Sequence, residues 1–363
     1  SLDAARIQVT LLDISQNGNG DFVLEGPYAR IVGRNSSGLQ VYTPQVESTA
    51  DGFQYDRSED GFEAVMAYYH IDKSQRYIQS LGITDLWSNG IDVNPRGTTA
   101  DESYFYPTQK LILLGLGGVD DAEDPSVIWH EYGHALLDTA VPGLLTSREG
   151  GALHEGFSDY WAASYTRSLV ESGQTTRDDW RWVFLWDSGE GSIWSGRFLD
   201  HLGTYPQDIC VANMSPGACN IHDDGRMWAT TLMEVYDRLG RLATDELVLL
   251  SHNYLSSFAT FADAAQAVIQ ADLDYNAGIN TPNLIGVFAP RGLIDASQYG
   301  PVIVHDQLVS TELVGVPITV TAVPNNGFIF TGWTEFPDST SSMILEITNP
   351  FPLTAVFEPS ELV

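Results

Sequence analysis

The stretch DPSVIWHEYGHALLDTAVPG at residues 124–143 contains the most informative pattern in the chain. Its leading Asp-Pro is typical of a helix N-cap and first helical position, and its closing Pro-Gly is typical of a helix stop, so we predict one helix between them. His130 and His134, four residues apart, lie on one face of such a helix, where both imidazoles can bind one zinc ion. Glu131 projects about 100° further round the helix, beside the open coordination position.

A second motif, HEGFSDYWA at residues 154–162, follows. We predict that a helix begins near Glu155, which places Glu155 and Asp159 on one face. One carboxylate then completes the metal site, while the other accepts a hydrogen bond from a ligand histidine. Two His and one Glu leave a fourth position for water, as in catalytic zinc sites, whereas structural sites are usually closed by four protein ligands.

The pattern of residues changes along the chain. About the first 60 residues alternate in the manner of strands, residues 61–81 have helical spacing, and residues 111–117 form a short apolar run that suits a buried strand. From about residue 125 onward, helical patterns dominate until about Leu293. These patterns predict an α+β fold with a β-rich N-terminal lobe and a helical C-terminal lobe.

Composition and charge exclude several classes of partner. The 363 residues include 48 acidic and 17 basic side chains, which gives a formal net charge of −31. We expect no nucleic-acid partner, because binding phosphates requires clustered Lys and Arg. No run approaches the roughly 20 apolar residues of a membrane helix, so we expect no membrane insertion. Solubility in a saline exterior and calcium binding would each explain the acidity.

The chain contains two cysteines, Cys210 and Cys219, in a stretch rich in Pro, Gly, Asn and Ser. In an exported protein they would close a local disulfide, whereas in a cytosolic protein they would be two free thiols. The pair alone leaves the compartment open.

HEYGH, EGFSD and the later stretch IHDDGRMWATTLMEVYDRLG resemble the thermolysin-like gluzincins, and most of all their fungalysin group. The similarity extends over roughly residues 25–295 and implies a zincin metallopeptidase. Position by position, it implies that His130, His134 and Glu155 bind zinc. It also implies that Glu131, as the general base, activates the zinc-bound water.

The resemblance implies roles for two more residues, and the chain differs from the family pattern at two positions. It implies that Asp159 orients a ligand histidine and that His222 stabilises the oxyanion. Leu145 stands where the thermolysin-like pattern has a tyrosine that assists the oxyanion, so either another tyrosine substitutes or His222 works alone. His154 stands where the family usually has Asn or Gly; as a metal ligand it is disfavoured relative to Glu155.

Other zincin classes have sequence motifs that this chain lacks. A metzincin would continue as HExxHxxGxxH, but Leu137 occupies the glycine position and Ala140 the position of the third histidine. An aminopeptidase of the gluzincin clan would carry a Gly-x-Met-Glu-Asn strand, which this chain lacks. The sequence therefore favours an endopeptidase, whose substrate strand we expect along an edge strand near Ser103 to Tyr106.

After Gly300 the sequence alternates with period two, and GFIFTGW and LTAVFEP resemble the internalin-type B repeat. We therefore predict a zinc metallopeptidase domain over residues 1–298 and a small all-β domain over residues 299–363. The repeat implies an extracellular bacterial protein, with cell-surface or matrix contact through this domain as one option and a spacer as the other.

An acidic run, Asp120, Asp121, Glu123 and Asp124, directly precedes the metal helix. Calcium binding and a plain set of caps and solvated carboxylates explain it equally well.

The function we predict is a secreted zinc endopeptidase acting on proteins or peptides. The alternative is a catalytically idle, peptidase-like protein that binds surfaces. Glu131 distinguishes the two, because an idle relative would be free to lose it and this chain retains it.

Overall fold

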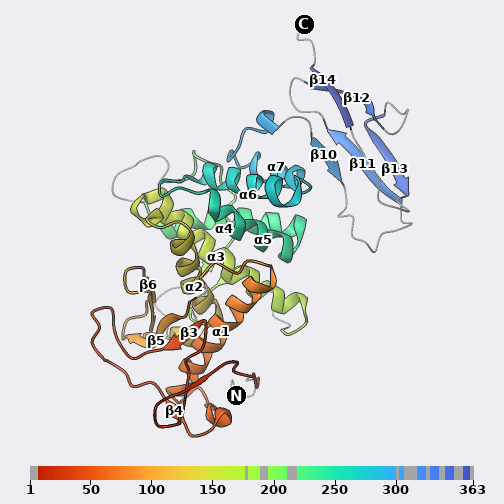
Figure 1. The fold of residues 1–363 in the computed structure, drawn as a ribbon. Helices are drawn as coiled ribbons and strands as arrows, with labels where there is room; N and C mark the ends of the chain where they lie inside the picture. Colours follow the sequence, from red (N-terminus) through yellow and green to blue (C-terminus); the bar gives the residue numbers. More distant parts are fainter. Residues whose placement is uncertain are drawn as a thin grey trace. The chain divides into compact units, whose positions relative to one another are not determined.

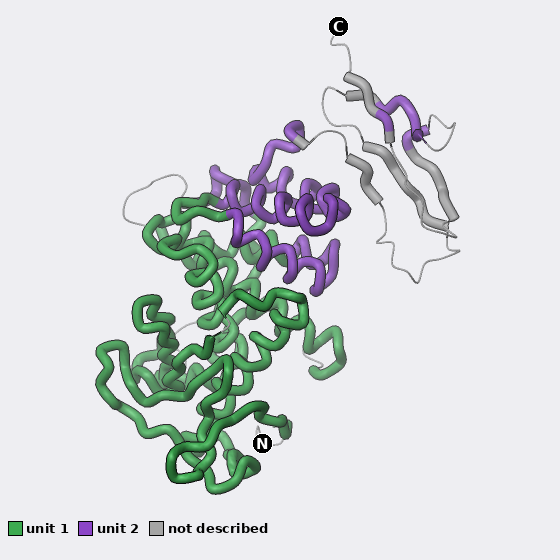
Figure 2. The backbone as a smooth tube through the Cα atoms, viewed as in Figure 1, with its two compact units in different colours: residues 1–202, 210–233, 255–260 green, residues 203–209, 234–254, 261–363 purple. Residues whose placement is uncertain are grey.

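The computed structural model of the chain describes all residues except 1–6, 88, 176–178, 189–194, 211–218, 300–301, 306–316, 324–327, 335–339, 347–354 and 360–363 (Figure 1). Two compact units divide the chain, coloured separately in Figure 2: residues 1–202, 210–233 and 255–260 form the first, and residues 203–209, 234–254 and 261–363 form the second. The predicted domain boundary between residues 298 and 299 stays a prediction.

The α-helices are α1 (Gly61–Ser80), α2 (Pro125–Ala140), α3 (Arg148–Glu171), α4 (Ile221–Leu239), α5 (Arg241–Ser251), α6 (Phe261–Asn276) and α7 (Thr281–Phe288). The strands of the first unit are β1 (Ser15–Gln16), β2 (Phe22–Val23), β3 (Ala29–Ile31), β4 (Val46–Glu47), β5 (Ile91–Thr98), β6 (Tyr104–Tyr106), β7 (Leu111–Gly115), β8 (Trp182–Val183) and β9 (Arg197–Phe198). Among the helices described, none has the length and apolar character needed to span a membrane.

The main sheet of the first unit has the strand order β3-β5-β7-β6. β3, β5 and β7 run parallel, and β6 runs antiparallel to β7 at the edge of the sheet. All five residues of β7 are buried, as expected of a strand covered on both faces. The strand and helix predicted at residues 111–117 and 61–81 correspond to β7 and α1.

Buried polar bonds join helix α1, which lies between β3 and β5 in the chain, to α2 and α3, which follow the sheet. The Tyr132 hydroxyl of α2 donates to Gln75 Oε1 of α1 at 2.7 Å, and Trp161 Nε1 of α3 donates to Ser74 Oγ of α1 at 3.0 Å. Because each buried donor has an acceptor, burying these tyrosine and tryptophan side chains carries no desolvation penalty for an unpaired polar group.

The ends of α2 follow the predicted signals, whereas the start of α3 does not. Asp124 caps α2 by accepting from Ser126 N at 2.8 Å, and Pro125 is the first helical residue. α3 begins at Arg148 and not near Glu155, so the predicted start was wrong. Ser147 caps α3, and the glycines at positions 150 and 151, poor helix formers, hide its first turn in the sequence.

The second unit combines helices α5, α6 and α7 with a β region at the C-terminal end of the chain. Its strands are β10 (Val302–His305), β11 (Pro317–Val323), β12 (Phe328–Trp333), β13 (Ser342–Glu346) and β14 (Ala355–Pro359). They form the antiparallel sheets β10-β11-β13 and β12-β14. This agrees with the all-β character predicted after Gly300.

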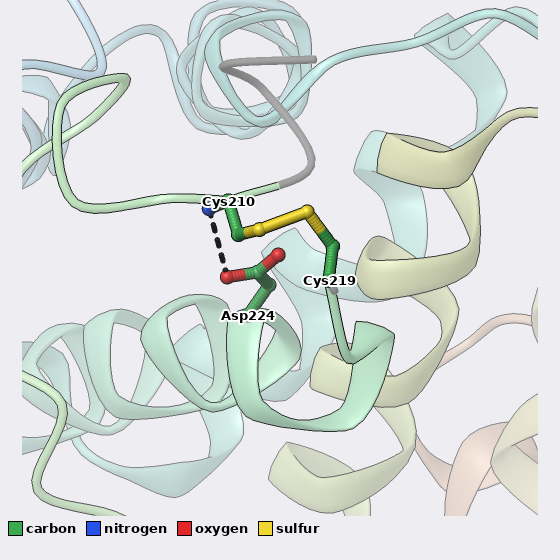
Figure 3. Close-up of a disulfide and its surroundings, with 3 residues drawn as sticks. All are labelled: Cys210, Cys219 and Asp224. Carbon is green, nitrogen blue, oxygen red and sulfur yellow. Dashed lines mark hydrogen bonds between the residues drawn. A yellow bond between two sulfur atoms is a disulfide. The ribbon is translucent and has the colours of Figure 1, made fainter. Parts of the chain in front are cut away.

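Cys210 and Cys219 form a disulfide with an S–S distance of 1.99 Å (Figure 3). Asp224 of α4 accepts a hydrogen bond from Cys210 N at 3.1 Å, which ties the disulfide to the helix that carries His222 (Figure 3). Although the two sulfurs and Asp224 are close enough to share a metal ion, sulfurs joined in a disulfide are not thiolate ligands.

Replacing both cysteines, as Cys210→Ser with Cys219→Ser, is expected to lower the free energy of unfolding by about 2 to 3 kcal/mol, because the closed loop of nine residues restricts the unfolded chain. Urea unfolding of the parent and the double variant measures the difference. A loss below about 0.5 kcal/mol would contradict the chain-entropy argument.

Candidate active site

Three side chains from α2 and α3 converge in the first unit. The Nε2 atoms of His130 and His134 lie 3.1 Å apart, and the Glu155 carboxylate lies 3.4 Å from His130 Nε2 and 3.6 Å from His134 Nε2. One ligand atom from each residue lies within 4.8 Å of the others. The structure thus brings together the three residues that the sequence predicts as metal ligands.

The ligand residues meet because α2 and α3 approach closely at Gly133. A Cβ atom at this position would come within 2.9 Å of Ser158 Cα, so no larger residue fits without moving a helix. Trp129 of α2 stacks on Tyr165 of α3, with ring centroids 4.1 Å apart, on the same pair of helices. The glycine between the two histidines therefore sets the distance from α2 to Glu155.

Asp159 lies behind His130. Its Oδ1 atom is 2.9 Å from His130 Nδ1, and its side chain is fully buried. A carboxylate at Nδ1 holds the proton there and leaves the lone pair of Nε2 directed at the ligand cluster. Burial opposes a charge on His130, but its interactions with Asp159 and Glu155 outweigh burial and raise the pKa of His130 to about 9.

Arg197 is a member of the site that sequence reasoning missed. It lies in β9 and makes a two-pronged bond to Asp159, with Nε–Oδ2 at 2.9 Å and Nη2–Oδ1 at 2.8 Å. The same Nη2 atom is 3.6 Å from the Glu155 carboxylate, and the guanidinium packs over the ring of Phe184. No periodic pattern surrounds this arginine; the scarcity of basic residues in an acidic chain was the only signal.

Glu131 follows His130 in α2 and interacts electrostatically with His130 and Glu155, but it is not one of the three residues whose ligand atoms cluster. It is 6% exposed, and its Oε2 atom has no hydrogen-bond partner. Burial, helped by the negative charge of Glu155, raises the pKa of Glu131 to about 7. A carboxylate of this kind suits proton transfer near neutral pH.

His222 reaches the cluster from the start of α4. Its Nε2 atom is 3.4 Å from Glu155 Oε1, and its Nδ1 atom is 2.9 Å from Asn220 Oδ1. At Gly225, one turn further along α4, a Cβ atom would come within 2.8 Å of Ala152 O, so the missing side chain permits this approach of α4 to α3. The His222 side chain is 46% exposed.

The chemistry of this donor set fits a metal ion. Glu155 Oε2 is buried and makes no hydrogen bond, and two imidazole nitrogens face it and each other. Burial opposes ionisation of Glu155, but His134, His130 and Arg197 outweigh it and hold the pKa of this carboxyl well below its usual range. An ionised carboxylate and two inward-facing nitrogens are the ligands that zinc takes.

Breaking the buried pair of Arg197 and Asp159 is expected to be costly. Arg197→Met leaves the Asp159 carboxylate buried without its guanidinium, and we expect a loss of about 3 to 5 kcal/mol in urea unfolding with a chelator present. Adding Asp159→Asn removes that charge, so the double variant loses less than the sum of the single variants.

The matched control for this comparison of single and double variants is Glu171→Gln. It removes an ion pair in which the glutamate side chain is 49% exposed, and we expect it to cost less than about 1 kcal/mol. Strict additivity of the Arg197 and Asp159 substitutions would contradict a direct coupling between these two residues.

The chain is similar to proteins that are named extracellular metalloproteinases. Over 209 residues the chain is 26% identical to "Extracellular metalloproteinase MEP" of Leptosphaeria maculans, and over 211 residues it is 28% identical to "Extracellular metalloproteinase 4" of Arthroderma otae. These alignments cover 50% of this chain but only 32% and 31% of the relatives, so the chain spans about a third of their length.

The fold has a counterpart among solved structures. The precursor of protealysin, a metalloproteinase from Serratia proteamaculans, matches with a TM-score of 0.53 at 13% identity, covering 78% of this chain and 90% of that chain. This likeness confirms the predicted α+β zincin fold. A sequence profile described as a divergent InlB B-repeat domain matches residues 297–361, which confirms the resemblance of the C-terminal β region. The profile of the fungalysin metallopeptidases (M36) matches residues 45–296, more than half of the sequence, and the chain belongs to this metallopeptidase family.

Proposed function

We propose that this chain is a secreted zinc endopeptidase that hydrolyses peptide bonds in proteins or peptides. His130, His134 and Glu155 hold the zinc ion. The observation that carries the proposal is the convergence of these three side chains, of which His130 and Glu155 are buried and His134 is 12% exposed, beside Glu131, a buried carboxylate with one oxygen free of hydrogen bonds. Membership of a metallopeptidase family supports it.

Each residue of the site has a distinct role in this proposal. A zinc ion held by these two His and one Glu would lower the pKa of a bound water molecule to about 7 and would polarise the scissile carbonyl. Glu131 accepts the proton of the attacking water and delivers it to the leaving amine. His222 donates a hydrogen bond to the oxyanion, and Asp159 holds His130 in the ligating tautomer.

The edge strand β6 is the proposed binding place for the substrate backbone. In the sheet, β7 pairs with one side of β6, and the other side has no strand partner among the described residues. The hydrogen bond to Glu102, burial and nearby negative charges, including Glu131, raise the pKa of Tyr104 to about 12, so β6 lies within electrostatic reach of the base. In this proposal an extended peptide pairs with the free side of β6.

Secretion is supported by three observations. The chain is strongly acidic, its two cysteines are joined in a disulfide, and similar proteins are named extracellular metalloproteinases. Disulfides persist outside the cytosol. The B-repeat match further supports a bacterial, surface-associated location in which residues 299–363 make the surface contact.

Steady-state kinetics and zinc content, both measured on two variants, test the proposal. Glu131→Gln is expected to retain zinc and to lower kcat by about 10² to 10⁴-fold, because it removes the proton acceptor and no ligand. His222→Ala is expected to lower kcat with a smaller effect on KM, since its hydrogen bond strengthens as charge develops on the oxyanion.

Glu171→Gln is the control for the glutamate substitution, since Glu171 lies at the exposed end of α3. Wild-type protein that binds one zinc ion yet cleaves neither casein nor a small peptide would favour the alternative, an idle surface-binding protein. Near-native turnover of Glu131→Gln with full zinc occupancy would assign the base to another residue.

We also propose a calcium ion at Asp101, Asp121 and Asp187, whose carboxylates lie within 4.8 Å of one another. Asp121 is 3% exposed, its Oδ1 atom has no hydrogen-bond partner, and Asp187 lies within hydrogen-bonding reach of it. Two buried carboxylates remain this close only with a proton or a cation between them. Calcium takes such oxygen ligands.

The rest of the acidic run has partners of its own. Asp124 caps α2, and Glu123 pairs with Arg57. Burial, together with the nearby Asp120 carboxyl group, raises the pKa of Glu63 to about 8. The alternative of caps and paired carboxylates therefore holds for these residues, and the calcium proposal rests on Asp121 alone among the four.

Asp121→Asn with Asp187→Asn tests the calcium site. Calcium at 100 times its dissociation constant is expected to stabilise the parent by about 2.7 kcal/mol and to leave the double variant unchanged. After dialysis against calcium-free buffer, the variant is expected to be the more stable, because it lacks the repulsion between the two carboxylates. Magnesium at the same concentration is the reference. If calcium raises the melting temperature of the parent no more than magnesium does, the site is refuted.

A further inference from the structure

His154 lies directly before Glu155 in α3 and is fully buried against His134. The Nδ1 atoms of the two rings are 3.3 Å apart, with the ring planes tilted by 32°. Nδ1 is the nitrogen of His134 that faces away from the ligand cluster, because its Nε2 atom is the one 3.1 Å from His130 Nε2. His154 thus contacts the ligand histidine from behind.

The tautomers at this contact follow from the ligand geometry. For Nε2 of His134 to present a lone pair to a metal ion, the proton of that ring must be on Nδ1. The partner of that proton is Nδ1 of His154, which can accept it only if His154 is neutral and carries its own proton on Nε2. The arrangement requires one specific tautomer in each ring.

The two ligand histidines therefore have chemically different partners. His130 donates from Nδ1 to the Asp159 carboxylate at 2.9 Å, whereas His134 faces a neutral imidazole at 3.3 Å. A carboxylate adds negative charge near the metal, but an imidazole orients the ring without adding charge. With the ligand Glu155 and the partner Asp159 both anionic, a neutral second partner limits the accumulation of buried charge.

We propose that His154 is a positioning residue, which fixes the tautomer and the ring orientation of His134 for metal binding. The proposal rests on the zinc site proposed above. It assigns His154 no bond to the metal, because its contact is to the nitrogen on the far side of the His134 ring. Partners of this kind typically change metal affinity about 10 to 100-fold.

The test compares three substitutions of His154 by zinc affinity, measured in competition with a chromogenic chelator. In His154→Asn, the amide Oδ1 takes nearly the place of the imidazole Nδ1 and still accepts from His134, so we expect affinity within about threefold of the parent. His154→Leu and His154→Ala remove the acceptor and are expected to weaken zinc binding about 10 to 100-fold.

Stability of the zinc-free proteins separates positioning from packing. If His154 only fills the core, the zinc affinities follow the free energies of unfolding, and asparagine ranks no better than leucine. The matched control is His70→Leu, which removes another buried histidine of the first unit, packed against Tyr69 and Tyr165, and is expected to leave zinc affinity unchanged.

The outcomes are distinguishable. Parent-like zinc affinity in both His154→Leu and His154→Ala overturns the inference while leaving the zinc site intact. An equal loss in His154→Asn and His154→Ala also overturns it, because an acceptor then does not restore the function. A parent protein that binds no zinc defeats the proposed function itself, and the inference with it.

Discussion

The close packing of α2 on α3 at Gly133 is the constraint on which the rest of the site depends. Neither helix holds a complete ligand set, because the two histidines belong to α2 and the carboxylate to α3. The approach of Gly133 to the Ser158 backbone closes the distance between them, and the stacked rings of Trp129 and Tyr165 fill the interface. Because packed interiors tolerate little added volume, a methyl group at position 133 would separate the ligands. The geometry of the site is therefore a consequence of helix packing.

The close packing of α2 on α3 brings several carboxylates together in a buried space, and the positive charge of Arg197 balances their negative charge. Glu131, Glu155 and Asp159 are all buried around the ligand cluster, and three carboxylates without cations would be strongly unfavourable there. The guanidinium contacts two of them, and its planar fork suits the paired geometry with Asp159. Arg197 thereby keeps Asp159 ionised, and an ionised Asp159 is what holds His130 in one tautomer.

The sequence predicts the parts of this site that depend on local rules. The ends of α2 and the shared face of His130 and His134 follow from capping and from helix periodicity, and both can be derived from a few adjacent residues. The start of α3 could not be predicted, because the adjacent glycines at 150 and 151 weaken the helical signal while Ser147 caps the helix before them. Arg197 could not be found either, since its role depends on a two-residue strand folding back onto Asp159.

A wider pattern in the use of arginine explains how so acidic a chain keeps a folded interior. The carboxylates of Glu63, Glu123 and Asp92 have side chains only 3%, 6% and 8% exposed, and each pairs with an arginine, as Asp159 does. With 17 basic residues against 48 acidic ones, arginines compensate some of the buried acids, and polar neighbours compensate others, such as Asp124 and Asp272. Asp121 departs from this pattern: it is 3% exposed, its Oδ1 atom has no hydrogen-bond partner, and burial raises its pKa to about 6. A carboxyl group in that position is compensated by a proton or by a cation from solution, so the stability of this part of the first unit depends on the composition of the surrounding medium.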